Sequence, residues 1–238
     1  MTRRRFVLNL MLCVLVTICF SLDDPLNNAN GAEQKRAAKR KRTPNPAMTP
    51  IKDNPALPRV LLIGDSISIG YTVPVRQVLA DKANVHRPLT NCGHTTKGLE
   101  SLDAWLGDGK WDIIHFNWGL HDLKYIEGEQ PVPLAQYEKN MTELVKRLKK
   151  TGARLIWCST TPVPKGCSPP RSNGDVIAYN KAAKRIMDAN DVAIDDLYGF
   201  ALPRVATIQL PKNVHFGSDG SVALAKQVAR SIFDELKK

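Results

Sequence analysis

Four short segments of the chain carry the residue types that acyl transfer requires. Ser66 follows Gly-Asp in a tight turn and offers a hydroxyl, Gly93 offers a backbone N–H, His121 a side-chain donor and His215 an imidazole. A nucleophile, donors that can bind an oxyanion and a general base are the parts of such a reaction. The segments are far apart along the chain, so the chemistry depends on a fold that brings them together.

The elements between these segments predict such a fold. Short apolar runs indicate buried strands, and they lie at residues 59–63, 112–116 and 154–158, with weaker runs at 85–89 and 192–197. Amphipathic patterns predict helices at 135–150 and 218–236, the second beginning at a Ser218/Asp219 cap. This alternation predicts an α/β protein: a three-layer α/β/α sandwich with about five parallel strands. Ligands bind at the carboxyl ends of such strands, and the four segments follow predicted strands or precede the last helix.

In this order, the four segments resemble the blocks of the GDSL/SGNH hydrolase family over residues 58–236. The resemblance implies a flavodoxin-like SGNH hydrolase fold with Ser66 as nucleophile and His215 as base. It also implies an oxyanion hole made by the backbone N–H groups of Ser66 and Gly93 and by the side chain at position 121.

Two positions depart from the family pattern. His121 stands where the family has Asn, and an imidazole N–H can still donate a hydrogen bond. Lys212 stands where the family has the Asp that orients the histidine, and a lysine cannot accept the imidazole N–H. We therefore expect a Ser66/His215 dyad. The group that orients His215 stays open between a backbone carbonyl and one of the aspartates 195, 196 and 219.

The N-terminal region predicts export. Arg3, Arg4 and Arg5 precede an apolar run that ends at Leu22, as in an export signal over residues 1–22. Sec and twin-arginine export both fit, and an uncleaved membrane anchor is the alternative. Residues 23–57 are basic and rich in proline, which predicts a flexible linker before a domain at 58–238.

The charge distribution argues against a nucleic-acid partner. The net charge is +11, but residues 1–53 hold ten Lys and Arg against four Asp and Glu. The basic excess thus belongs mostly to the N-terminal region, and membrane contact is expected at most through that segment.

Neither a metal nor a cofactor is expected. The five histidines lack the spacing of a metal motif, and the chain has no Gly-rich phosphate loop. Beyond the signal three cysteines remain, of which Cys158 and Cys167 could form a bridge, although their spacing does not require one. His115 is expected in the core, and Asp122 is expected to anchor its loop by accepting backbone N–H bonds.

Together these features predict an exported serine hydrolase that cleaves an ester through an acyl-enzyme. The expected substrate is a small acyl ester, acetyl above all, on a carbohydrate such as an acetylated polysaccharide. Trp118 could offer a platform for a sugar ring or simply pack in the core, and Ser66 could be a mere helix N-cap. The alternative function is a catalytically decayed relative that binds carbohydrate or acts as a scaffold.

Overall fold

The computed structural model of the chain describes residues 44–238, which form one compact unit beginning at Pro44. The predicted export signal and the first part of the predicted linker lie outside these residues. None of the helices in the described part is long and apolar enough to cross a membrane.

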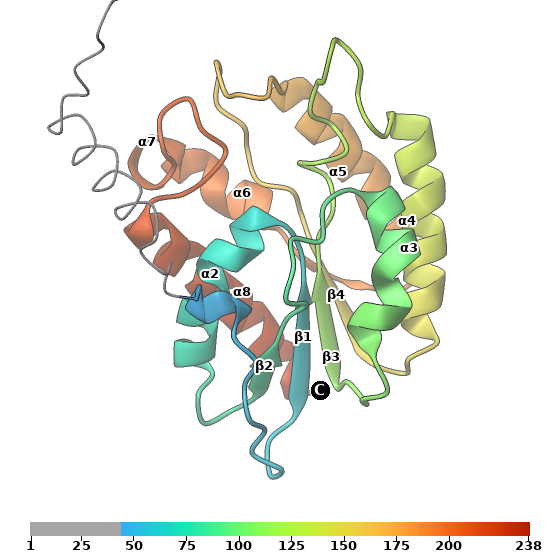
Figure 1. Cartoon of the computed structure of the whole chain (residues 1–238), viewed down its shortest axis with the longest axis vertical. Helices are drawn as coiled ribbons and strands as arrows, with labels where there is room; N and C mark the ends of the chain where they lie inside the picture. Colours follow the sequence, from blue (N-terminus) through green and yellow to red (C-terminus); the bar gives the residue numbers. More distant parts are fainter. Residues whose placement is uncertain (1–43) are drawn as a thin grey trace, which may run out of the picture. The chain divides into compact units, whose positions relative to one another are not determined.

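A five-stranded parallel sheet forms the centre of this unit (Figure 1). Its strands are β1 (Arg59–Ile63), β2 (Asn84–His86), β3 (Ile113–Phe116), β4 (Arg154–Cys158) and β5 (Ala193–Asp195), and their order is β2-β1-β3-β4-β5. The register pairs Ile63 at the end of β1 with Phe116 at the end of β3, and Phe116 with Trp157, one residue before the end of β4, so the carboxyl ends of these strands are nearly level. The predicted fold class is confirmed, and the segments expected to do chemistry emerge at one edge.

Helices cover both faces of the sheet. On one face α2 (Ser66–Val78) packs against α8 (Ser218–Leu236), and on the other α4 (Leu134–Lys149) packs between α3 (Thr95–Leu106) and α5 (Asn173–Asp188) (Figure 1). Three short helical segments precede α8, namely α6 (Leu197–Ala201), η2 (Leu202–Arg204) and α7 (Val205–Ile208), and η1 (Pro46–Met48) lies near the start of the described chain.

The buried positions of α4 recur every three or four residues, among them Tyr137, Met141, Leu144 and Leu148. The same apolar positions predict this helix from the sequence. They form one apolar face, and its burial against the sheet stabilises α4. The cap predicted for the last helix is wrong. Gly217 precedes α8 without a side-chain cap, because Ser218 is already the first helical residue.

The predicted linker differs in its C-terminal part, because residues 44–57 pack onto the domain. Ala47 is buried, and Arg76 donates to the carbonyl of Pro46 at 3.0 Å. Asn84 at the start of β2 exchanges hydrogen bonds with Asn54, accepting from its N–H at 2.8 Å and donating to its carbonyl at 2.9 Å. These long-range contacts replace the solvent that a free linker would have, so the compact unit begins earlier than position 58.

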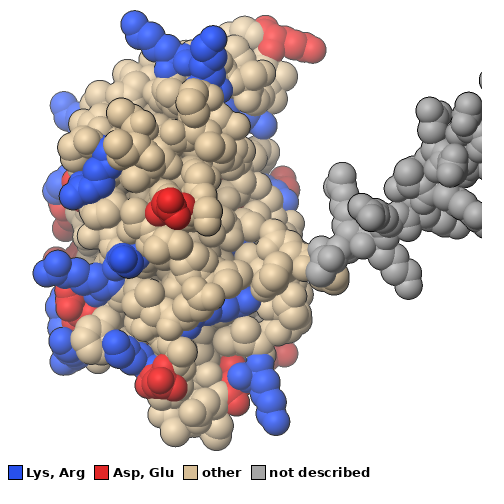
Figure 2. Space-filling model, turned by 90° about the vertical axis from the view of Figure 1, so that its left-hand side faces the viewer, with Lys and Arg blue, Asp and Glu red and all other residues tan. Residues whose placement is uncertain are grey.

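Cys92, Cys158 and Cys167 are all buried and free, so the Cys158–Cys167 bridge does not form. Burial raises the pKa of the Cys92 thiol to about 11. These thiols therefore behave as small hydrophobic groups. On the face shown in Figure 2, the Lys and Arg side chains are spread among single Asp and Glu side chains, with uncharged surface between them.

Candidate active site

Ser66 and His215 meet at the carboxyl edge of the sheet, although 149 positions separate them. Ser66 is the first residue of α2, and its Oγ lies 2.8 Å from His215 Nε2. The residue that caps α2 is Asp65, whose side chain accepts from the N–H of Ile67 at 2.9 Å. The hydroxyl of Ser66 is therefore free of a capping role and lies at the positive end of the helix dipole.

A buried arginine that the motifs did not indicate holds the turn before Ser66. Arg87 is 5% exposed, and its guanidinium donates to the carbonyls of Gly64 and Thr90, both at 3.3 Å. It also donates to the hydroxyls of Ser68 and Thr72, both at 3.0 Å. Burial lowers its pKa, and the guanidinium remains charged because its ordinary pKa is so high. Arg87 thus ties the nucleophile turn to the segment that leads to Gly93.

The N–H of Gly93, which is expected to be an oxyanion donor, already has a hydrogen-bond partner. Its φ of +64° is left-handed, which explains the need for glycine. The N–H donates to Asn91 Oδ1 at 2.9 Å, and Lys97 Nζ donates to the Asn91 carbonyl at 2.7 Å. The hydrogen bond between the Gly93 N–H and Asn91 Oδ1 must therefore break before this N–H can bind a substrate oxygen. His94, the next residue, caps α3 by accepting from the N–H of Lys97.

His121 is half-buried in the loop after β3. Burial lowers the pKa of its imidazole, and the nearby cations Lys124 and Arg171 lower it further, against the opposite effect of Asp65. The ring is therefore neutral at pH 7, with one nitrogen as donor and the other as acceptor. Asp65, which precedes Ser66, is near enough to act on the pKa of this imidazole.

Asp122 joins the loop of His121 to the start of α3. Its buried Oδ1 accepts from the N–H and from the hydroxyl of Thr95, at 2.8 and 2.6 Å. Asn140 of α4 in turn donates to the Thr95 hydroxyl at 2.9 Å. The anchoring role predicted for Asp122 is confirmed, and burial raises the pKa of its carboxyl to about 7.

The loop before α8 presents His215 in a way that the sequence did not predict. His215 Nδ1 lies 2.7 Å from Asn213 Oδ1, so both ring nitrogens have partners, one at Ser66 and one at Asn213. Lys212 is exposed, with a left-handed φ of +52°. The only sequence signal for Asn213 is a polar amide two residues before the histidine.

None of the three aspartates that were expected to orient His215 forms a hydrogen bond with its ring. Asp195 accepts from Gln227 Nε2 at 2.9 Å and lies 3.1 Å from His115 Nε2. Asp196 caps α6, and Asp219 lies in the first turn of α8. None of them occupies a ring nitrogen of His215.

Within residues 44–238, one cluster of side chains could converge on a metal ion. The ligand atoms of His115, Cys158 and Asp195 lie within 4.8 Å of one another, and all three residues are buried in the core, as expected for His115. The His115–Asp195 and Gln227–Asp195 hydrogen bonds explain the cluster as a polar part of the core behind the sheet edge.

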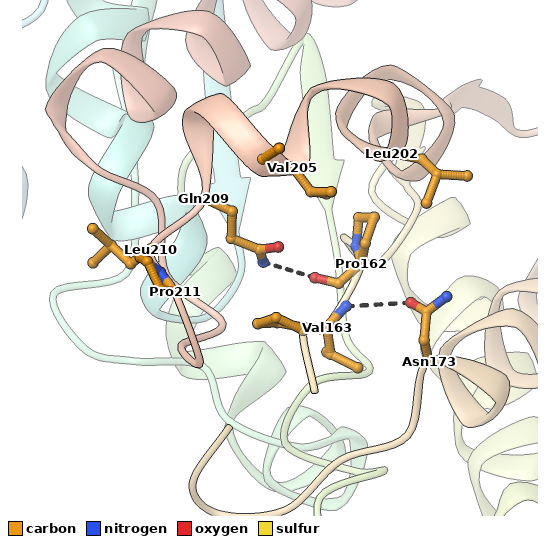
Figure 3. Close-up of a pocket in the computed structure, with 10 residues that line it drawn as sticks. Pro162, Val163, Asn173, Leu202, Val205, Gln209, Leu210 and Pro211 are labelled. Carbon is orange, nitrogen blue, oxygen red and sulfur yellow. Dashed lines mark hydrogen bonds between the residues drawn. The ribbon is translucent and has the colours of Figure 1, made fainter. Parts of the chain in front are cut away.

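Two cavities flank the loop that carries His215. A recess of about 50 Å³ adjoins Ser66 and is lined by Gly70, Phe216 and Ser221. A larger apolar cavity of about 350 Å³ lies between the 162–164 segment and the 202–211 segment. Figure 3 shows Gln209 at its wall, where Nε2 donates to the carbonyl of Pro162 at 2.8 Å.

Trp118 does not provide a sugar platform. Its side chain is 1% exposed and its ring lies 5.9 Å from that of Phe116, so it packs in the core beneath the loop. Trp157 is buried as well. Neither buried tryptophan can therefore stack on a sugar ring.

Residues 62–223 match the model of the GDSL-like lipase/acylhydrolase family. The match covers more than half of the chain, which therefore belongs to this family and is an ester hydrolase of the GDSL/SGNH type. No curated protein matches the chain.

Solved structures share the fold at low sequence identity. The acetyl xylan esterase AlAXEase is 15% identical, with a TM-score of 0.64 over 73% of this chain and 99% of its own. The lipase/acylhydrolase from Enterococcus faecalis is 19% identical, with a TM-score of 0.64 over 74% and 96%. Axe2, an acetylxylan esterase from Geobacillus stearothermophilus, is 18% identical, with a TM-score of 0.63 over 74% and 94%. At these identities the likeness concerns the fold.

Proposed function

We propose that this ester hydrolase removes small acyl groups, acetyl above all, from carbohydrate through an acyl-enzyme on Ser66. The observation that carries the proposal is the contact of 2.8 Å between Ser66 Oγ and His215 Nε2 at the carboxyl edge of the sheet. This distance lies within the range in which a general base takes a hydroxyl proton.

The reaction proceeds in two halves. Ser66 Oγ attacks the ester carbonyl while His215 Nε2 takes its proton, and collapse of the tetrahedral intermediate expels the alcohol with that proton. Water then attacks the acyl-enzyme, with His215 again accepting the proton. The acid is released, the proton returns to Ser66 Oγ, and no cofactor takes part.

The oxyanion forms near the start of α2. The Ser66 N–H belongs to the first helical turn, whose N–H groups have no acceptor within the helix. Together with the helix dipole it favours negative charge at this point. The Gly93 N–H joins once Asn91 releases it, and the neutral His121 ring supplies the third donor.

The choice of a small acyl group rests on space and on the fold relatives. The recess beside Ser66 is about 50 Å³, which suits a group of a few heavy atoms rather than a long chain. Two of the fold relatives are acetylxylan esterases, which favours acetylated carbohydrate as the source of the ester. Export follows from the basic and apolar pattern of residues 1–22, and a polysaccharide outside the cytoplasm would then be accessible.

Hydrolysis of 4-nitrophenyl acetate, butyrate and octanoate by the full chain tests the proposal. We expect the acetate to give the highest kcat/KM, and Ser66→Ala to reduce turnover to the buffer rate. Ser231→Ala, in α8 away from the site, is the matched control and should keep full activity. Acetate release from acetylated xylan then tests the carbohydrate. Equal rates for the wild type and Ser66→Ala would refute the acyl-enzyme, and a preference for octanoate would refute the small acyl group.

A further inference from the structure

The hydrogen bonds of His215 define which nitrogen must carry the proton. For Nε2 to accept the proton of Ser66 it must present a lone pair, so the ring proton resides on Nδ1. That proton needs an acceptor, and the atom in place is Asn213 Oδ1 at 2.7 Å. We propose that Asn213 is the positioning residue of a Ser66–His215–Asn213 triad, in which an amide takes the place of the usual carboxylate. The inference rests on the proposed function.

The orientation of the Asn213 amide is set by the backbone. The same Oδ1 accepts from the backbone N–H of His215 at 3.0 Å, which closes an Asx turn. Turning the amide by 180° would direct its NH2 group at two N–H donors, with the loss of both hydrogen bonds. The oxygen therefore faces the imidazole, and the Nδ1–H tautomer is favoured.

Hydrogen bonds within the loop stabilise this turn. Leu210 N–H donates to the His215 carbonyl at 3.0 Å, and Asn213 N–H donates to the Leu210 carbonyl at 3.2 Å. Gln209 Nε2 donates to the Val214 carbonyl at 3.1 Å. Lys212 adopts the left-handed conformation within this turn. Residue 213, and not residue 212, is thereby brought onto the ring.

This arrangement differs from the replacement of a triad aspartate by asparagine. In the Ser-His-Asp triad of the chymotrypsin fold, that replacement lowers kcat by about 10⁴-fold because it stabilises the wrong tautomer. In this chain the backbone N–H of His215 also donates to Asn213 Oδ1, which keeps the amide oxygen toward the ring and so disfavours the wrong tautomer. A Cys-His-Asn triad in papain-like proteases works with an amide in the same role. The amide orients the ring but lacks the charge that would stabilise the imidazolium formed during attack.

Steady-state kinetics of Asn213→Ala, Asn213→Asp and Lys212→Asp, with thermal unfolding of each variant, test the role. We expect Asn213→Ala to lower kcat by about 10- to 100-fold with KM unchanged, as part of the roughly 10²- to 10⁴-fold contribution of a general base. Asn213→Asp should match or exceed the wild-type kcat. It should also move the acidic limb of the pH–rate profile to higher pH by up to about one unit, because a carboxylate favours the charged imidazole. Lys212→Asp should leave kcat unchanged, because the loop brings residue 213 and not residue 212 onto the ring.

A tautomer measurement separates this inference from the proposed function. In the full chain labelled with ¹⁵N-histidine, the His215 resonances should report Nδ1–H in the wild type and a tautomer mixture in Asn213→Ala. Assignment would use a His215→Gln variant. Absence of ester turnover in the wild type would refute the proposed function, whereas the Nδ1–H signature would still show that Asn213 positions the His215 ring. A wild-type tautomer and pH profile in Asn213→Ala, or a rise in rate confined to Lys212→Asp, would overturn the inference.

Discussion

Asp122 allows a quantitative test of how the site is built. Its carboxyl is buried, and burial raises its pKa from 3.8 to about 7. In the folded chain the protonated form is therefore favoured at pH values where the unfolded chain is ionised. The sign follows from the raised pKa: the contribution to the free energy of unfolding is fully present below pH 3.8 and is lost as the pH rises through 7.

The expected magnitude follows from the size of this shift. A difference of about three pKa units corresponds to about 4 kcal/mol at roughly 1.4 kcal/mol per unit. Asp122→Asn retains an oxygen for the N–H and hydroxyl of Thr95 but cannot ionise. The free energy of unfolding of the wild type should thus fall by about 4 kcal/mol relative to the variant between pH 4 and pH 8. This change is a large part of the stability of an ordinary domain.

Urea unfolding at half-unit pH steps, followed by circular dichroism, measures the effect. Asp108→Asn, at an exposed position, is the matched control and should follow the wild type throughout. Curves of free energy against pH that run parallel for the wild type and Asp122→Asn would show that folding does not raise the pKa of Asp122. Burial would then not be what sets the pKa of this carboxyl.

Three further substitutions test the scaffold of the site. Gly93→Ala should lower kcat at least 10-fold and the free energy of unfolding by about 1–2 kcal/mol, since the φ of +64° at this position disfavours a Cβ. Steady-state kinetics measure the first effect and thermal unfolding the second. Arg87→Lys should cost about 2–4 kcal/mol in urea unfolding, because an ammonium has three donors for the four groups that Arg87 binds from its guanidinium end. Gly220→Ala should cost about 1–3 kcal/mol by the same assay, because the added methyl meets the carbonyl of Ile208.

Matched controls accompany these variants. Gly128→Ala has a left-handed φ of +87° in open space, so it should lose stability without losing kcat. Arg230→Lys on the surface and Gly174→Ala in the first turn of α5 should change stability by less than about 1 kcal/mol. A Gly93→Ala enzyme with wild-type kcat, or an Arg87→Lys or Gly220→Ala protein as stable as its control, would contradict the reasoning.

The amino-acid sequence by itself determined the sheet and the reacting pair. Apolar runs bounded by polar turns locate strands because parallel strands are buried on both faces, and the helices of this fold show their buried stripe in the same local way. Ser66 and His215 were identifiable because their segments follow a predicted strand and precede the last helix. The short β2 and β5 were predicted too long, since pairing with neighbouring strands decides where a strand ends.

The tertiary structure alone decided what surrounds that pair. Asn213 orients His215 because a left-handed residue at 212 and the bonds of Leu210 and Gln209 shape the loop, and none of these is visible in a pattern of residue types. Arg87 finds its acceptors at Gly64 and Thr90 only after β1 and β2 are side by side. Hydrogen bonds of this kind depend on distances of a few tenths of an ångström, which packing sets and sequence periodicity does not.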